Sequence, residues 1–315
     1  MNNPLALFRN LRDLYLRYLD SPFDLRYRDL VRERRALLDR DGYLWREPLI
    51  EPVPAYPPCG RNFRGMAHEL LDTSWGTPAV GELSDFVACG AFRADLQPYE
   101  HQQRTFEQSV VRGRDVVVTT GTGSGKTECF LLPLISALVR ESATWGAPAP
   151  RNAHWDWWNH YTMTGDRRSW EPRIPQRAHE NPAERPVAIR ALLLYPLNAL
   201  VEDQLIRLRE SLDSTPARAW LDAHRRGNRF YFGRYTGRTP VSGDRNSGNT
   251  ARLRTDLREM ERDAGLVANN PEARRFFQTM DGAEMWSRWD MQDAPPDLLI
   301  TNYWASVISS WSGEE

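Results

Sequence analysis

The stretch that decides the fold is Asp115-Val116-Val117-Val118-Thr119-Thr120-Gly121-Thr122-Gly123-Ser124-Gly125-Lys126-Thr127. Its apolar, β-branched start predicts a buried strand over 115–119, and the amphipathic residues 126–140 that follow predict a helix. A strand, a glycine-rich loop and a helix in this order are the context of a phosphate-binding loop. Glycines let the backbone of such a loop point its N–H groups at phosphate oxygens, next to the positive end of the helix.

The loop residues predict a site for ATP and Mg²⁺. Lys126, the expected catalytic residue, would reach the β- and γ-phosphates, and the hydroxyl of Thr127 would ligate Mg²⁺. The backbone of the six preceding residues would cradle the phosphates; these are Thr120, Gly121, Thr122, Gly123, Ser124 and Gly125. The strict pattern has a glycine where Thr120 stands, so the loop is a variant. A glycine-rich turn without function is the alternative.

The composition singles out the same lysine. Lys126 is the only lysine among the 41 basic residues, and the other 40 are arginines. Codon bias in a GC-rich genome explains the excess of arginine but not the position of the one lysine. A chemical need for a compact ammonium group, which the planar guanidinium of arginine cannot replace, explains that position better.

Several classes of protein are excluded by composition. A length of 315 residues with 41% apolar residues allows one large or two small domains with a real core. The mean hydropathy of −0.62 and the absence of a long apolar run argue against a spanning helix, and no secretory signal is visible. The three cysteines form no Cys-x-x-Cys pair, which argues against a disulfide framework or a zinc site and suits the cytoplasm. A net charge of −1 means that any nucleic-acid binding must come from local patches.

The chain is expected to have two parts. Residues 1–95 are interpreted as a mainly helical accessory region, with a proline-rich linker or irregular arm around 52–60. Helical patterns in this region cover 4–19, 27–38, 64–72 and 80–91. The Arg-rich face of the second pattern is either a basic nucleic-acid surface or a solvated helix face.

Residues 96–315 are expected to form an α/β domain. Apolar runs that predict strands alternate there with helical stretches, at 116–118, 191–195, 229–232 and 298–300. This alternation indicates a parallel sheet covered on both faces. Two insertions, 141–188 and 241–296, interrupt it. The first holds five of the twelve tryptophans, which either stack on nucleic-acid bases or form the core of the insertion.

The segment before the loop adds a family resemblance. With Tyr99-Glu100-His101-Gln102-Gln103 placed just upstream of the loop, the chain resembles superfamily 2 helicases of the DEAD/DEAH-box type. In that family a glutamine at the spacing of Gln102 reads the adenine edge, for which a carboxamide offers both a donor and an acceptor. The resemblance implies a RecA-like fold for residues 96–315.

Three further segments resemble the nucleic-acid motifs of the same family: 195–204, 235–240 and 296–303. Each has small or polar residues at the carboxyl end of an expected strand, where an open parallel sheet binds its ligands. The resemblance implies that residues there contact the nucleic-acid backbone, DNA being favoured over RNA; they are Pro196, Asn198, Gly237, Arg238, Thr301 and Asn302. The segments are most similar to those of very large bacterial helicases, some of which belong to antiphage defence systems of the Druantia or DISARM kind. Other defence-system proteins are therefore expected partners, and a membrane is not.

The family pattern is incomplete in these 315 residues. The Asp-Glu pair that would bind Mg²⁺ and position the attacking water is not found, nor is a second RecA-like domain. We therefore expect the N-terminal, ATP-binding portion of a DNA helicase or translocase that does not hydrolyse ATP alone. The alternatives are a fragment that binds nucleic acid or a partner without hydrolysis, and a P-loop ATPase of another class, such as a signalling or transport ATPase.

Overall fold

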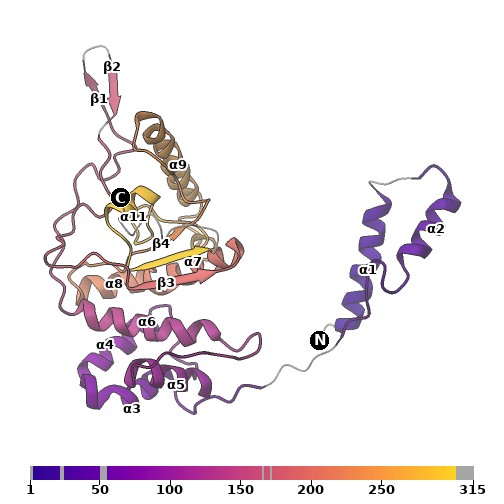
Figure 1. Ribbon diagram of the computed structural model, residues 1–315, viewed down its shortest axis with the longest axis horizontal. Helices are drawn as coiled ribbons and strands as arrows, with labels where there is room; N and C mark the ends of the chain where they lie inside the picture. Colours follow the sequence, from indigo (N-terminus) through magenta and orange to yellow (C-terminus); the bar gives the residue numbers. More distant parts are fainter. Residues whose placement is uncertain (1–2, 22–24, 50–54, 165–166, 171, 303–315) are drawn as a thin grey trace, which may run out of the picture. The chain divides into compact units, whose positions relative to one another are not determined.

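The computed structural model describes residues 3–21, 25–49, 55–164, 167–170 and 172–302, and the chain divides into two compact units, Met1–Ala55 and Tyr56–Glu315 (Figure 1). The first unit contains helices α1 (Pro4–Asp20) and α2 (Arg28–Leu38). The side chain of Asn3 caps α1 by accepting the N–H of Leu5 at 3.0 Å, and Pro4 occupies the first helical position, as the sequence predicts. Arg34 of α2 pairs with Asp20 at 2.7 Å.

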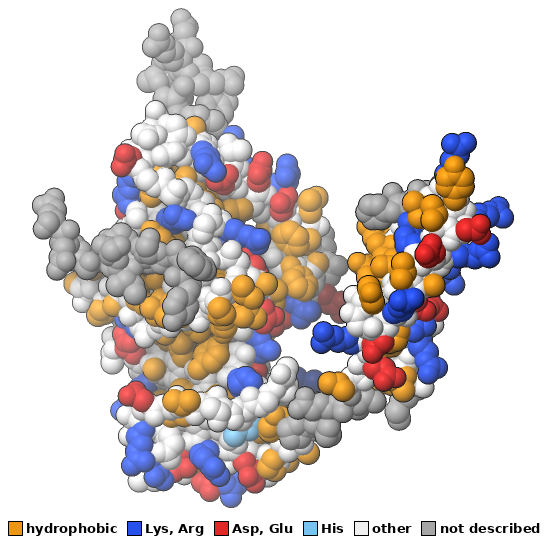
Figure 2. Space-filling model, turned by 45° about the vertical axis from the view of Figure 1, so that its right-hand side comes forward, with side chains coloured by type: hydrophobic (Ala, Val, Ile, Leu, Met, Phe, Trp, Pro, Cys, Tyr) orange, Lys and Arg blue, Asp and Glu red, His pale blue; other side chains and the backbone are white. Residues whose placement is uncertain are grey.

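Hydrophobic side chains remain exposed on this first unit. They lie along the helices between charged residues (Figure 2), and on α1 they are Leu5, Leu7, Leu11, Leu14, Tyr15 and Tyr18. Only Leu16 of α1 is buried, and α2 buries no residue. Two short helices cannot enclose a core of their own, so this unit contributes little burial to the stability of the chain.

A helical layer begins the second unit. Its members are α3 (Phe63–Trp75), α4 (Thr77–Ala88), α5 (Glu100–Phe106), the π-helix η1 (Glu107–Val111) and α6 (Lys126–Ser142). Phe63, Phe86 and Ile135 are among the side chains that join these helices in one buried core. The helices of 56–95 thus pack on the helix that follows the glycine-rich loop. The boundary between the two units falls at residue 55, inside the accessory region expected over 1–95. The division of the chain at residue 95 into an accessory region and an ATP-binding domain stays a prediction.

The sheet has three parallel strands in the order β3-β5-β4, which are β3 (Ala191–Tyr195), β4 (Phe232–Tyr235) and β5 (Leu298–Asn302). Helices α7 (Asn198–Leu212) and α8 (Thr215–His224) connect β3 to β4. The central strand β5 buries Leu298, Leu299 and Ile300 almost completely. Parallel strands joined through helices make this an α/β fold, the partial RecA-like domain that the sequence predicts.

Two predicted strands differ from the structure. The strand predicted over 115–119 is absent: the described residues 113–121 pair with no strand, and Val117 is 88% exposed. An apolar run becomes a strand only where a neighbouring edge accepts its hydrogen bonds, and none of the described strands lies against this run. The strand predicted over 229–232 begins instead at Phe232, because the N–H of Tyr231 donates to the carboxylate of Asp297 at 2.7 Å rather than to a ladder.

The two insertions share a second core. The first contains the antiparallel strands β1 (Tyr161–Thr164) and β2 (Arg167–Trp170), and the second contains α9 (Ser247–Leu266), α10 (Pro271–Arg274) and α11 (Arg288–Asp293). Trp157 and Trp158 pack there against Leu253 and Leu257 of α9 and against Trp286. Because Trp157 and Trp158 are almost fully buried, these two indoles form core and are not available to stack on bases.

Candidate nucleotide site and nucleic-acid face

The glycine-rich loop has the backbone that a phosphate cradle needs. Gly123 and Gly125 have φ angles of 77° and 72°, in the left-handed region that favours glycine, and Gly125 is the N-cap of α6. A Cβ atom at Gly125 would lie 2.3 Å from Nε2 of Gln102, so the close contact with Gln102 also leaves no room for a side chain at this position. The loop and the helix of the predicted motif are therefore present, without the preceding strand.

The side chain of Lys126 folds back onto the backbone of the glycine-rich loop. Its Nζ donates to the backbone carbonyls of Thr120 at 2.7 Å and Gly121 at 2.8 Å, and the side chain is exposed. Thr120, which stands where the strict pattern has glycine, joins the two sides of the loop by a 2.6 Å hydrogen bond between its hydroxyl and that of Ser124. A triphosphate would replace these carbonyls as the acceptor for the ammonium group. Gly121, Thr122 and Gly123 are exposed and available to a ligand.

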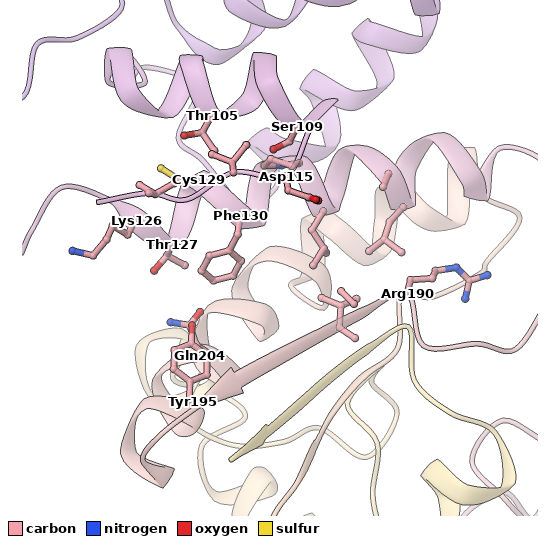
Figure 3. Close-up of a pocket in the computed structure, with 18 of the residues that line it drawn as sticks. Thr105, Ser109, Asp115, Lys126, Thr127, Cys129, Phe130, Arg190, Tyr195 and Gln204 are labelled. Carbon is pink, nitrogen blue, oxygen red and sulfur yellow. The ribbon is translucent and has the colours of Figure 1, made fainter. Parts of the chain in front are cut away.

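Thr127 follows on the first turn of α6, half-buried, and lines one cavity together with Lys126 (Figure 3). Its hydroxyl is a suitable oxygen ligand for Mg²⁺. Among the described residues, no group of three or more His, Cys, Asp or Glu side chains could hold a metal ion. Thr127 would therefore supply a single hydroxyl ligand to an Mg²⁺ ion that arrives with a nucleotide.

Gln102 ties helix α5 to the loop. Its Nε2 donates to the carbonyl of Gly125 at 2.9 Å, and its Oε1 accepts the N–H of Tyr99 at 2.8 Å. The side chain is buried, but an amide has a second N–H and a second lone pair that these two bonds leave unused. Contact with adenine therefore stays a prediction. The neighbouring ring of His101 bonds the carbonyl of Ser124 at 2.8 Å, a contact that the sequence did not predict.

The cavity continues from Lys126 and Thr127 between α6 and the free edge of β3, with a volume of about 920 Å³ (Figure 3). Most of its walls are apolar, and they come from the unpaired segment, from α6 and from the sheet; they include Val116, Val118, Phe130, Leu134, Ala191 and Leu298. Tyr195 and Gln204 line it from the β3–α7 side, and Glu141 with Arg190 marks its far end. Arg190 lowers the pKa of Glu141 by hydrogen bonding to its carboxylate.

The residues expected to contact nucleic acid gather at one edge of the sheet. The Nδ2 of Asn302, at the end of β5, donates to Oδ1 of Asn198, the first residue of α7, at 2.7 Å. The hydroxyl of Thr301 donates to the carbonyl of Tyr235, the last residue of β4, at 2.8 Å.

The remaining candidates lie in the turns that leave the same strand ends. Pro196 directly follows β3, and Gly237 follows β4, with no neighbouring atom within 4 Å of the place that a Cβ would take. Arg238 is 66% exposed, and its nearest carboxylate, that of Glu202, lies 4.0 Å away. All six candidate positions therefore lie at or just beyond the carboxyl ends of the parallel strands, and their contact with nucleic acid stays a prediction.

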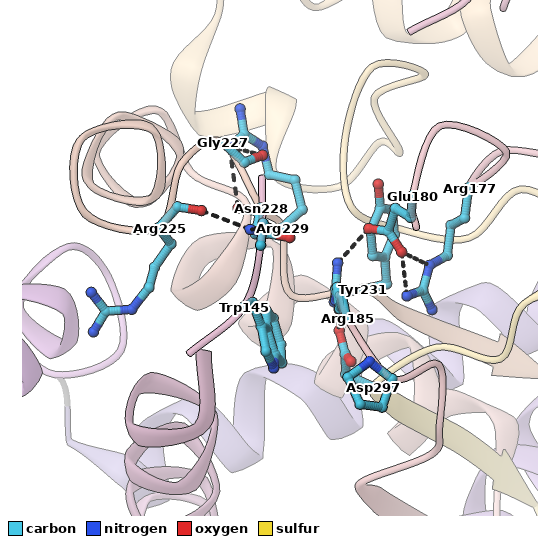
Figure 4. A network of polar contacts seen from close by, with 12 residues as sticks. Trp145, Arg177, Glu180, Arg185, Arg225, Gly227, Asn228, Arg229, Tyr231 and Asp297 are labelled. Carbon is cyan, nitrogen blue, oxygen red and sulfur yellow. Dashed lines mark hydrogen bonds and ion pairs between the residues drawn. The ribbon is translucent and has the colours of Figure 1, made fainter. Parts of the chain in front are cut away.

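A buried ionic network fixes the insertion to the sheet (Figure 4). Asp297, fully buried before β5, pairs with Arg185 at 2.6 Å and Arg190 at 2.7 Å. Arg185 also pairs with Glu180 and lies over the ring of Trp145, 4.2 Å from its centroid. Burial, with the nearby arginines Arg151, Arg177 and Arg185, lowers the pKa of His179 to about 4. The sequence did not predict this network, because its members are ordinary charged residues far apart along the chain.

Comparisons with known proteins show what these features are similar to. The family model of the DEAD/DEAH box helicases matches residues 99–229, a range that contains Gln102, the loop and Asn198. The chain is 30% identical, over 95% of its length, to Druantia protein DruE of Escherichia coli (strain UMEA 4076-1), and this alignment covers 16% of that protein. It is 34% identical over 32% of its length to the ATP-dependent RNA helicase DDX54 of Mus musculus, covering 12% of that protein.

The chain thus spans less than a fifth of either relative. No solved structure matches it. None of the helices in the described part of the chain is long and apolar enough to cross a membrane.

Proposed function

We propose that residues 1–315, of which 99–229 match the family model of the DEAD/DEAH box helicases, bind ATP with Mg²⁺ as the N-terminal portion of a DNA helicase or translocase. The observation that carries the proposal is the loop itself. Gly125 caps α6 in the left-handed conformation, and the ammonium group of Lys126 already lies on loop carbonyls where phosphate oxygens would compete for it. Backbone N–H groups, a helix N-terminus and a lysine together form a binding site for a triphosphate.

Nucleic acid is proposed to bind at the edge formed by the ends of β3, β4 and β5. Asn198, Asn302 and the exposed guanidinium of Arg238 could contact phosphates there and fix the register without reading sequence. DNA is proposed as the substrate on the resemblance to large bacterial helicases; the Druantia protein aligns with 95% of the chain, whereas the relative named as an RNA helicase aligns with 32%. The same similarity supports other defence-system proteins as partners.

Hydrolysis by residues 1–315 alone is proposed to be negligible. The described strands of the parallel sheet end at Tyr195, Tyr235 and Asn302, so none of them ends in an Asp-Glu pair that could position the attacking water. Glu128, the acidic side chain nearest the loop along the sequence, pairs with Arg207 at 2.8 Å. Residues 1–315 would therefore hold ATP without turning it over, which is also what the alternative of a non-hydrolysing binding fragment requires.

Nucleotide binding is tested by titrating fluorescent ATP into the wild-type chain and Lys126→Ala. Lys126→Ala should abolish measurable binding and leave the circular dichroism spectrum and the melting temperature unchanged, because its side chain is exposed. Arg104→Ala, which removes an exposed positive charge from neighbouring α5, is the matched control and should bind normally. Equal affinity of Lys126→Ala and wild type would overturn the assignment of the loop.

The class of ATPase is tested by adding single-stranded DNA or RNA of the same base sequence to the titration. A helicase portion should bind ATP more tightly when nucleic acid is present, because the two ligands favour the same arrangement of the sheet edge. A signalling or transport ATPase should show no response. A response to RNA alone would contradict the preference for DNA.

A further inference from the structure

The proline-rich arm at residues 56–60 lies beside the glycine-rich loop. Its backbone is bound to the segment that leads into α5: the N–H of Cys59 donates to the carbonyl of Pro98 at 2.8 Å, and the N–H of Glu100 donates to the carbonyl of Pro57 at 2.9 Å. These two bonds flank an antiparallel bridge between Pro58 and Tyr99. An arm held at both sides in this way is an ordered part of the second unit.

This arm places Tyr56 against the glycine-rich loop. The Tyr56 ring packs on two rings of the α5 segment, with its centroid 5.4 Å from that of His101 and 5.8 Å from that of Tyr99. Its hydroxyl reaches the loop, because a Cβ atom built on Gly121 would lie only 2.7 Å from it. His101 in turn bonds the carbonyl of Ser124, so the loop is contacted by both aromatic residues.

The hydroxyl of Tyr56 is buried and has no hydrogen-bond partner among the described residues. Buried polar groups are nearly always paired, and an exception calls for an explanation such as a strained site or an absent ligand. The same stretch of loop also holds the ammonium group of Lys126, which donates to the carbonyl of Gly121 at 2.8 Å. The hydroxyl of Tyr56 and the ammonium group of Lys126 therefore both lie at Gly121, where a phosphate oxygen could accept a hydrogen bond from each.

We propose that Tyr56 is a nucleotide-binding residue whose hydroxyl donates a hydrogen bond to the triphosphate of the bound nucleotide. This inference rests on the proposed function and adds a residue to its site. Phosphate oxygens at the loop would supply the acceptor that the hydroxyl lacks, in a bond strengthened by the charge of the phosphate. The arm 56–60 would then be a wall of the site, with Tyr99 and His101 fixing the orientation of the Tyr56 ring.

The test compares Tyr56→Phe with wild type for binding of three probes: Mg·ATP, inorganic triphosphate and AMP. Tyr56→Phe keeps the ring and its contacts and removes only the hydroxyl. Losing a hydrogen bond to a charged group should weaken binding of Mg·ATP and of inorganic triphosphate about tenfold or more. Binding of AMP, which has no β- or γ-phosphate, should not change. Tyr43→Phe, at a tyrosine 70% exposed in the first unit, is the control and should bind all three probes normally.

Each other outcome overturns the proposal. Unchanged affinity for Mg·ATP would show that the hydroxyl contacts no ligand, and tighter binding would show that it only holds the empty loop closed. A loss for Mg·ATP without a loss for inorganic triphosphate would assign the contact to the base or ribose. Failure of the wild-type chain to bind Mg·ATP would refute the proposed function itself, whereas normal wild-type binding with an unaffected Tyr56→Phe would refute only this inference. A melting temperature equal to that of wild type excludes a folding defect.

Discussion

The side chain of Asn302, at the end of β5, donates a hydrogen bond of 2.7 Å to the side chain of Asn198, which begins α7. The two residues are 104 positions apart along the chain. Their bond joins the end of the central strand to the turn that leaves β3, while Thr301 joins the same strand end to β4 through the carbonyl of Tyr235. The three strand ends therefore form one connected polar edge, at the position where open parallel sheets bind their ligands.

Arg238→Ala should weaken binding of single-stranded DNA without changing the affinity for ATP. The guanidinium of Arg238 is exposed beside this edge, and among the described residues its one ion-pair partner, Glu202, lies 4.0 Å away, so it can neutralise one phosphate. Fluorescence anisotropy at several salt concentrations should show weaker binding of every DNA sequence, and a plot of log affinity against log salt whose slope is smaller by about one.

Arg93→Ala is the matched control for Arg238→Ala, because Arg93 is similarly exposed but lies between α4 and α5. It should leave both the affinity for DNA and the salt slope unchanged. Equal effects of the two substitutions would mean that DNA is attracted by general surface charge and not by the strand-end edge.

The sequence predicts the parts of this edge that have a local hydrophobic pattern. Strand-end residues such as Asn198 and Asn302 were predictable, because apolar runs locate parallel strands and the ligand edge of such a sheet is known in advance. Val116 to Val118 have an equally clear strand pattern, yet in the structure they pair with no strand. A hydrophobic pattern indicates a tendency to form a strand, whereas hydrogen bonding into a sheet requires that another strand lies alongside.

Tyr56 illustrates what the sequence could not predict about the site. It lies in a proline-rich stretch that predicts a linker or an irregular arm without saying what it contacts, and its approach to Gly121 depends on backbone bonds between segments about forty residues apart. Asp297 is similar, since one partner, Arg185, lies in the first insertion and the other, Arg190, directly precedes β3, both more than a hundred residues away along the chain. Contacts of this kind come from tertiary packing, which no local periodicity encodes.

Trp158→Ala should destabilise the insertions without lowering the affinity for DNA. The Trp158 ring is fully buried against Trp286, and its indole N–H donates to Glu261 of α9 at 3.0 Å. Removing a large buried ring costs about 3–5 kcal/mol. Limited proteolysis should therefore cut the insertions of the variant faster than those of wild type. Weaker DNA binding with unchanged proteolysis would restore the alternative that this tryptophan stacks on bases.

Asp297→Asn should lower the free energy of unfolding by about 3–5 kcal/mol, measured by denaturant titration, because it leaves the buried guanidinium of Arg185 and the partly buried one of Arg190 without their shared anion. Burial favours the neutral form of Asp297, but two arginines and the N–H of Tyr231 bond its oxygens, so the carboxylate is charged in the folded protein. Asp95→Asn, in an exposed pair with Arg93, is the control and should cause no measurable loss. Equal stability of Asp297→Asn and wild type would show that the network is replaceable.

The stability of the chain should fall in acid partly because of His179. The pKa of His179 is lowered from 6.5 to about 4 by burial, with the positive charges of Arg151, Arg177 and Arg185 adding to it. Between these two pH values the unfolded chain binds a proton that the folded chain does not, so the contribution of His179 to stability is present above pH 6.5 and is lost as the pH falls toward 4. The ring is partly exposed, so the loss should be on the order of 1–2 kcal/mol, less than the full shift implies.

His179→Gln separates this effect from the titration of the carboxylates. Glutamine does not ionise, so the variant should lose less stability than wild type when denaturant titrations at pH 7 and pH 4.5 are compared. The three arginines that face the ring remain in both proteins, and the acidic groups titrate alike in both, so the difference between the two pH profiles isolates the histidine. Parallel profiles would show that His179 takes up its proton in the folded protein as easily as in the unfolded chain, which would mean that solvent reaches the ring and screens it from the arginines.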